Sequence, residues 1–240
     1  MDFSNAADMY VGSSPVKEVW MNGKLVWHRP NNIGLMLTGG QIIDYTQVMA
    51  EGKTYELSEV VGVTVQETEV SFIIHPNYAK NGQTCYWSWG SPALSESLFR
   101  TTLETEADDH ITGYEDTQTL IADFDSAGAS WGRPSNEYAV YAADNVTFSN
   151  GEKGYLMSAG EAVIIFDNRI IINTLLAKIN GADTIVDGKG IWTSTLNANA
   201  GETLISAWYL MEEHDKGHRI DGVNVQSMKY VRPIARLINN

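Results

Sequence analysis

The most constraining local signal in the sequence is the dipeptide Asn22-Gly23, which joins two short runs rich in apolar residues, 16–21 and 24–27. Both residues of the dipeptide tolerate a positive φ, so the pair favours a type I′ turn. Two apolar runs joined by such a turn predict a β-hairpin. The start of the chain is therefore expected to form an antiparallel pair of strands.

The predicted hairpin is apolar on both faces. A two-residue turn places Val19 opposite Val26 on one face. On the other face Trp20 opposes Leu25, with Trp27 diagonal to it. An isolated hairpin is marginal in water, so one with two apolar faces needs cover from another surface. These five residues are our candidates for anchoring or oligomerisation, and docking onto the rest of the same chain is the alternative.

The sequence divides into a short N-terminal arm and one larger domain. The arm ends in the turn-rich stretch Arg29-Pro30-Asn31-Asn32, which is typical of a linker. From residue 33 onward no low-complexity stretch or internal repeat is found. We predict an anchoring and oligomerisation arm over 1–32 and a single domain over 33–240, a length that one domain can fill.

The larger domain alternates short strands with short helices. Ser158 and Glu161 form a capping box, which predicts a helix that continues over 162–178 and ends by Gly181. The other expected elements are helices over 117–124, with Asp116 as N-cap, and over 137–143, and strands over 70–74, 191–195, 204–211 and 229–235. The predicted class is α+β, with short antiparallel strands and two to three helices.

The charge balance excludes several partners. The chain has 16 basic and 30 acidic residues and a formal net charge of −14, which repels phosphate backbones and anionic lipid surfaces. We expect no nucleic-acid partner. The first residues lack the basic and apolar regions of a secretory signal, and no apolar run approaches the roughly 20 residues that span a bilayer. We expect synthesis in a cytoplasm, no signal peptide and no membrane insertion.

Residues that could carry chemistry are scattered. Cys85 is the single cysteine, which excludes an intrachain disulfide and thiolate-rich metal sites. His214 and His218 have the spacing of a helical zinc site, but Gly217 and the missing glutamate after the first histidine argue against such a site. The acidic stretch 106–110 offers oxygen ligands for calcium, yet 30 acidic residues produce such clusters by chance. With no phosphate loop, nucleophile elbow or distinctive carboxylate pair, we predict no metal, cofactor or enzymatic activity.

The C-terminal half carries a resemblance to a known domain family. Five ordered blocks carry it: Gly154-Tyr155-Leu156-Met157-Ser158-Ala159-Gly160-Glu161, then Asn168, Trp192-Thr193-Ser194-Thr195, Ala207-Trp208-Tyr209-Leu210 and Tyr230-Val231-Arg232-Pro233. The order is similar to an adhesin domain of gut Bacteroidetes, of their phages and of a collagen-like Legionella adhesin. That family belongs to the C-type-lectin-like class, which also contains formylglycine-generating enzymes. The resemblance implies a C-type-lectin-like binding domain.

The resemblance does not extend to the chemistry of its class. Formylglycine-generating enzymes hold copper with two cysteines, and the motifs with which true C-type lectins bind calcium and sugar do not occur here. Trp192 and Trp208 stand on short predicted strands and are interpreted as core residues. Arg232, beside a proline, is interpreted as a structural residue that binds a carboxylate or carbonyl groups inside the fold. A non-enzymatic binding role remains.

Candidate ligand residues come from two sources. Trp87, Trp89 and Trp131 lie in stretches rich in Gly, Ser and Pro that are typical of loops, where flat rings can stack on a ligand. In the lectin-like class the ligand surface lies on loops between the late strands, which the resemblance places at 197–202 and 212–219. The candidates there are Asn197, Asn199, Glu212, Glu213, His214, Asp215, His218 and Arg219.

The arm carries a second resemblance. Val11-Gly12-Ser13, followed by Val19-Trp20 and Val26-Trp27, resembles the openings of bacteriophage virion proteins. It implies a fibre or decoration protein on the exterior of a phage particle, most simply a head fibre of a crAss-like or other Bacteroidetes phage. Residues 1–32 would bind other virion proteins of the capsid or tail, and the domain would attach to a glycan or cell-surface receptor. Hairpins closing around an axis predict a homotrimer.

Three alternatives stay open at this point. The chain could be a tail-associated receptor-binding protein, in which case the arm would bind the tail. It could be a glycan-acting enzyme on the same scaffold, which would release products from its ligand. It could be a purely architectural virion protein, whose larger domain contacts neighbouring subunits and no receptor.

Overall fold

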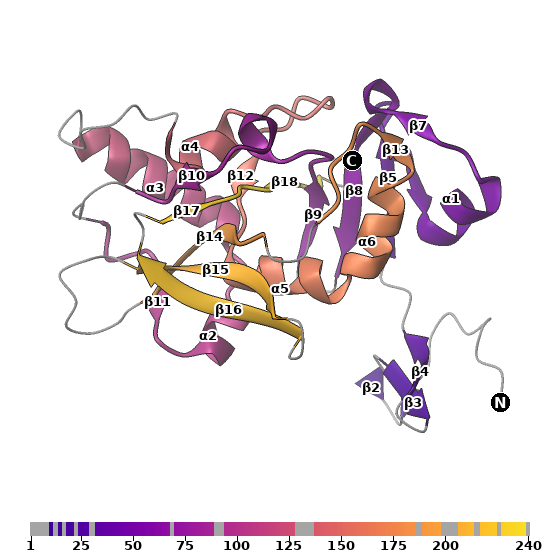
Figure 1. The fold of residues 1–240 in the computed structure, drawn as a ribbon, viewed down its shortest axis with the longest axis horizontal. Helices are drawn as coiled ribbons and strands as arrows, with labels where there is room; N and C mark the ends of the chain where they lie inside the picture. Colours follow the sequence, from indigo (N-terminus) through magenta and orange to yellow (C-terminus); the bar gives the residue numbers. More distant parts are fainter. Residues whose placement is uncertain are drawn as a thin grey trace.

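The fold is described by a computed structural model, drawn in Figure 1. The described residues are 10–11, 14–15, 18–21, 24–28, 32–67, 70–88, 94–127, 137–185, 189–197, 206–213, 217–224 and 227–238. Among them the chain is α+β, which confirms the predicted class. The predicted number of helices was too low, because the described residues form six α-helices. Two unpredicted ones, α1 (Tyr45–Glu51) and α2 (Glu104–Asp108), are too short to show a helical period.

A six-stranded antiparallel sheet forms one half of the body (Figure 1). Its order is β12 (Tyr155–Leu156), β18 (Pro233–Arg236), β9 (Ser71–Ile74), β8 (Val60–Gln66), β5 (Asn32–Leu37) and β6 (Ile42–Asp44). The strand predicted over 70–74 is β9, so that prediction is confirmed. The run Val60–Val65 is buried throughout, as the apolar sequence of a central strand requires. This sheet therefore has cover on both faces.

A four-stranded sheet forms the other half. Its order is β11 (Arg100–Thr101), β14 (Ile191–Asn197), β15 (Ser206–Glu213) and β16 (Gly217–Asn224), with β11 parallel to β14. Two smaller pairs are β10 (Cys85–Tyr86) with β17 (Met228–Lys229), and β7 (Tyr55–Glu56) with β13 (Ile179–Asn180). The expected strand over 229–235 is thus divided between β17 and β18, and it serves two different sheets.

The capping box is confirmed at the start of α5 (Ala159–Asp167). The Ser158 hydroxyl accepts a hydrogen bond from the Glu161 amide, and the Glu161 carboxylate accepts one from the Ser158 amide at 2.7 Å. The prediction of one continuous helix was wrong, because Asn168 separates α5 from α6 (Arg169–Leu176), which ends well before Gly181. The Asn168 side chain donates to the Ile164 carbonyl, and such competition with the backbone interrupts helices.

The two other predicted helices are present with shifted ends. The helix expected over 117–124 is α3 (Gly113–Ala127), and the one expected over 137–143 is α4 (Ala139–Asp144). Because α3 begins at Gly113, Asp116 lies inside its first turn and is not the N-cap that we predicted. Gly113 lies so close to α5 that an added Cβ would stand 2.3 Å from a Glu161 carboxylate oxygen. The glycine therefore permits the contact between the two helix starts.

Helices α5 and α6 connect the two sheets. Helix α6 packs on β5 and β8, while α5 packs on β15 and β16 (Figure 1). Trp192 and Trp208 are 0% and 5% exposed, which confirms their interpretation as core residues. Each indole donates a hydrogen bond, Trp192 to the Cys85 carbonyl at 2.9 Å and Trp208 to the Thr101 carbonyl at 3.2 Å. The two rings thus join the late strands to residues more than a hundred positions earlier.

The N-terminal hairpin is present as β3 (Glu18–Met21) and β4 (Lys24–His28). Trp20 opposes Leu25 as predicted, but Val19 pairs with Trp27, because a register shift leaves Val26 as an additional residue. The dipeptide Asn22-Gly23 lies outside the described residues. In Figure 1 this hairpin and the short pair β1 (Tyr10–Val11) and β2 (Ser14–Pro15) lie apart from the body. The division at residue 32 stays a prediction.

Candidate functional site

The tryptophans predicted to bind a ligand do not form a described surface. Trp87 is 1% exposed, and its indole donates to the Thr193 carbonyl at 2.8 Å. Its ring packs edge-on against Phe124 within a cluster of buried hydrophobic residues. The prediction that Trp87 stacks on a ligand was wrong, because the ring is inside. Trp89 and Trp131 lie outside the described residues.

The late loops predicted to carry the ligand surface are organised differently. Asn197 is the last residue of β14, where it is half-buried and pairs with Ser206, and Asn199 lies outside the described residues. The stretch 212–219 was predicted to be an exposed loop, but most of it belongs to the long hairpin of β15 and β16. In its register Glu212 opposes His218, with Glu213 opposite Gly217 and Met211 opposite Arg219.

The hairpin of β15 and β16 also argues against the helical zinc site that the spacing of His214 and His218 suggested. His218 lies in a strand, so the four-residue spacing from His214 does not place the two on one helix face. His214 and Asp215 lie outside the described residues. Within the described part of the chain no group of three His, Cys, Asp or Glu side chains is arranged to hold a metal ion. None of the described helices has the length and apolar character to cross a membrane.

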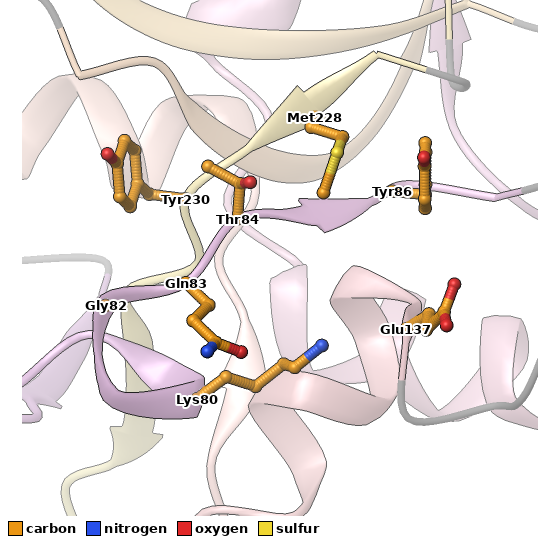
Figure 2. A pocket seen from close by; sticks show the side chains of 8 residues that line it. All are labelled: Lys80, Gly82, Gln83, Thr84, Tyr86, Glu137, Met228 and Tyr230. Atoms are coloured by element: carbon orange, nitrogen blue, oxygen red, sulfur yellow. The ribbon is translucent and has the colours of Figure 1, made fainter.

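A groove of about 510 Å³ lies beside β10 and β17, and Figure 2 shows its lining. Three stretches that are distant in the sequence meet here: the segment 80–86, Glu137 two residues before α4, and β17 with the residue that follows it. The lining residues are Lys80, Gly82, Gln83, Thr84, Tyr86, Glu137, Met228 and Tyr230. None of them was among the ligand-binding residues predicted from the sequence.

The wall of the groove is held by pairing between β10 and β17. Tyr86 pairs with Met228 in the antiparallel register, and its backbone also bridges Tyr138 just before α4. The neighbouring residue Cys85 is 1% exposed, and burial raises the pKa of its thiol. The Tyr86 backbone is thus supported on both sides, while its ring remains half-buried at the groove.

The edge of the groove is a left-handed turn. Lys80, Asn81 and Gly82 have φ values of 52°, 55° and 76° in succession, within the 3-10 turn η2 (Ala79–Gly82). Lys80 and Asn81 are the described non-glycine residues with positive φ. A non-glycine residue in this region costs about 1 to 2 kcal/mol, and such strain gathers where the chain has a task besides folding. The turn therefore marks this edge as a functional candidate.

Behind the groove two cations contact aromatic rings. The ammonium of Lys189 lies 4.5 Å from the centroid of Tyr230 and 4.9 Å from that of Tyr78. The Arg232 guanidinium lies 4.7 Å from the Tyr78 ring centroid and donates to the Asp183 carbonyl at 2.7 Å. Arg232 is fully buried, and burial lowers its pKa to about 10. This location agrees with the structural role interpreted from the sequence.

A second polar cluster lies deep between α3, α5 and β14. The Asp116 carboxylate binds both His110, at 2.7 Å, and Ser194, at 2.8 Å. These are the residue types of a hydrolytic triad, but here the carboxylate stands between the serine and the histidine, so the histidine does not contact the hydroxyl. The side chains of His110 and Asp116 are 9% and 8% exposed. The arrangement joins buried elements and does not activate a nucleophile.

The groove is therefore the arrangement that suits binding. The Tyr86 and Tyr230 rings offer flat apolar faces, and the side chains beside them offer amide, hydroxyl, carboxylate and ammonium groups (Figure 2). Among the described residues one carboxylate, that of Glu137, lines the groove, so this part of the lining does not supply the two carboxyl groups of most glycoside hydrolases. The signal available in the sequence was the Asn81-Gly82 dipeptide, a turn dipeptide that draws notice only once the structure brings partners to it.

Comparisons with known proteins bear on the fold. No protein-family model and no curated protein matches the chain. Among solved structures, a fimbrial protein from Bacteroides ovatus is similar, with a TM-score of 0.50 and 14% sequence identity. The similarity covers 69% of this chain but 35% of the fimbrial protein, so this chain corresponds to about a third of that protein's length. At this identity the likeness concerns the fold alone.

Proposed function

We propose that this protein is a non-enzymatic attachment module that binds a saccharide in the groove beside β10 and β17. The observation that carries the proposal is the combination of two tyrosine rings with planar polar side chains in one cavity. Sugars present apolar CH faces and hydroxyl groups together, and a few placed polar groups beside aromatic rings match that chemistry. Gln83 and Glu137 supply the hydrogen-bonding partners.

Two similarities support an adhesin-like role. The fold is similar to that of a fimbrial protein, and the sequence blocks from residue 154 onward resemble an adhesin domain of the C-type-lectin-like class. The lectin-like assignment of residues 33–240 is part of the proposal. The groove lies at a different place from the late-loop surface that this class uses.

The proposed position of the protein is the exterior of a phage particle. The motif within residues 11–27 resembles virion proteins, and the hairpin of β3 and β4 offers the means of anchoring to a capsid or tail protein. As a fibre the chain would be a homotrimer made in the host cytoplasm. In this arrangement many copies raise the avidity of a weak single site.

Binding is tested by a glycan array probed with the full-length protein. The wild type is expected to bind a restricted set of glycans, and Gln83→Ala is expected to lose affinity at least about tenfold. Gln83 is exposed, so its substitution leaves the core intact. The matched control is Gln47→Ala on α1, another exposed glutamine, which should bind as the wild type does. Equal binding by both variants would place the ligand elsewhere.

The enzymatic alternative and the fibre assignment have separate tests. Incubation of a bound glycan with the protein should release no product, and turnover that Glu137→Gln abolishes would establish an enzyme instead. Light scattering of the full-length protein should give a trimer that Trp20→Ser with Trp27→Ser converts to a monomer. A wild-type monomer would contradict the trimeric fibre without affecting the groove.

A further inference from the structure

The surroundings of the groove are cationic although the chain as a whole is strongly acidic. The formal net charge is −14. Lys80 lines the groove, and Lys189 and Arg232 contact the rings of Tyr230 and Tyr78 behind it. The acidic side chains here are Glu137 in the lining and Asp183, which binds the Tyr78 amide. A local excess of cations creates a positive electrostatic potential at this place on an acidic protein, and that potential attracts an anion.

Lys80 has no partner within the described part of the chain. Its ammonium forms no hydrogen bond or ion pair there, although the residue is half-buried. Other lysines are occupied: Lys53 pairs with Glu59 at 3.1 Å, and Lys153 lies 3.5 Å from an Asp144 oxygen. Figure 2 shows the Lys80 side chain extended along the groove in the direction of Glu137. A lysine ammonium without a partner gains a charge-assisted hydrogen bond from an added anion.

The backbone holds Lys80 in this position before any ligand arrives. Its left-handed φ of 52° sets the direction in which the side chain leaves the turn. The Gln83 amide donates to the Lys80 carbonyl at 3.2 Å, and the Ala79 amide donates to the Val231 carbonyl at 2.9 Å, which ties the turn to the C-terminal segment. A cation held in place pays less conformational entropy on binding.

We propose that the groove selects an anionic saccharide, whose negatively charged group pairs with Lys80 while its hydroxyl groups donate to Glu137. This inference rests on the proposed function and specifies its ligand class. The anionic group can be the carboxylate of a uronic acid or a sulfate ester, because a lysine ammonium binds either as a point charge. The tyrosine rings contact the apolar face of the same sugar.

The experiment is titration calorimetry of the full-length protein with three tetrasaccharides. They are tetragalacturonate, its fully methyl-esterified form, and a sulfated neutral tetrasaccharide. Tetragalacturonate or the sulfated ligand is expected to bind at least about tenfold more tightly than the methyl ester. The ligand that binds more tightly identifies the anionic group as a carboxylate or a sulfate ester. Affinity for the anionic ligand should fall as salt rises, since the charge pair is solvent-accessible.

The variant Lys80→Gln keeps the length and polarity of the side chain but removes its charge. It is expected to lower affinity for the anionic ligand about tenfold and to leave the weak binding of the methyl ester unchanged. Lys53→Gln is the matched control, because Lys53 is a solvent-exposed lysine, two residues before β7, and does not line the groove. It should bind as the wild type does.

The outcomes separate the two proposals. If the methyl ester binds as tightly as tetragalacturonate and the sulfated ligand, or if Lys80→Gln binds the anionic ligands as the wild type does, the inference is overturned. If glycan binding is still weakened by Gln83→Ala in that case, the proposed function stands. If none of the three tetrasaccharides binds and no array glycan is sensitive to Gln83→Ala, both proposals fail.

Discussion

Two buried polar centres of this protein differ in how completely their groups are satisfied. Between α3 and α5, the Glu161 carboxylate accepts hydrogen bonds from the Ser158 amide, the Ser158 hydroxyl and the Tyr155 hydroxyl, at 2.7, 3.0 and 2.8 Å. Asp116 beside it has two partners. Behind the groove, Arg232 is equally buried, but its Nε and Nη1 atoms have no hydrogen-bond partner among the residues that the structure describes.

The difference shows where this fold tolerates unfavourable energy. The centre between the helices gives its buried carboxyl groups hydrogen-bond partners, which is what a structural junction requires. The groove side combines an incompletely paired guanidinium with two strained residues, Lys80 and Asn81, in the adjacent turn. Local violations of this kind are expected at functional sites, where the surrounding structure must hold groups in place for a ligand. The comparison therefore supports the groove as the site.

The largest expected effect is at the satisfied centre. Asp116→Ala removes the acceptor of both His110 and Ser194 and leaves them buried without it, so we expect a loss of about 3 to 5 kcal/mol in the free energy of unfolding. Urea denaturation measures it. Asp116→Asn retains one acceptor and should lose less. A loss below about 1 kcal/mol for the alanine variant would show that the junction does not depend on this network.

The next effect is a pH dependence at the same centre. Burial raises the pKa of Glu161 from 4.5 to about 7, and the neighbouring Asp116 adds to this increase. The native state therefore holds a proton that the unfolded chain releases, so the Glu161 contribution to stability is present below about pH 4.5 and is lost as pH rises to about 7. The loss is on the order of a few kcal/mol.

Glu161→Gln isolates this effect, because the neutral amide does not titrate. Urea denaturation between pH 4.5 and 8 should show the free energy of unfolding of the wild type falling relative to that of the variant. A constant difference between the two proteins across this range would show that Glu161 is ionised in the native state throughout.

On the groove side we expect a gain in stability at the cost of binding. Lys80→Gly relieves the left-handed strain and should raise the free energy of unfolding by about 0.5 to 1 kcal/mol, while affinity for the anionic saccharide falls. Lys53→Gly is the control, since Lys53 has no positive φ and should lose stability. Thermal denaturation with calorimetric binding measures both. A Lys80→Gly variant that loses stability would remove the strain argument.

The smallest expected effect sharpens the comparison. Arg232→Met fills a similar volume and removes a buried charge whose Nε and Nη1 atoms are unpaired, so the free energy of unfolding should change by about 1 kcal/mol or less. Losing the hydrogen bond to the Asp183 carbonyl and the contact with Tyr78 opposes this relief. If chemical denaturation gives a loss comparable to that of Asp116→Ala, the two buried centres are energetically alike.

Prediction from the sequence succeeded where a local rule was sufficient. The capping box at Ser158 marked the start of α5, and the burial of Trp192 and Trp208 followed from their setting on short apolar strands. It failed where a local signal competed with packing. Asp116 resembles an N-cap, but α3 begins earlier, and the carboxylate turns inward to His110 and Ser194. Trp87 likewise has a loop-like sequence context and a buried ring.

The candidate site could not have been found this way, because its members have no pattern in common. Residues 80–86, 137 and 228–230 meet only because β17 pairs with β10 and because Tyr86 bridges Tyr138. None of these pairings is encoded by spacing. The charged stretch 212–219 illustrates the reverse error, since the family resemblance placed it in a loop whereas its pairing across β15 and β16 makes most of it strand.

The sequence alone determined the features that depend on residues adjacent along the chain or on composition. These are the α+β class, the capped helix, the hairpin around Asn22-Gly23 and the acidic balance. Turns, caps and net charge depend on a few adjacent groups or on a sum, so no fold is needed to evaluate them. The tertiary structure alone decided which side chains became buried acids, unpaired cations or groove walls. Those properties depend on contacts between distant segments, which only the closed chain creates.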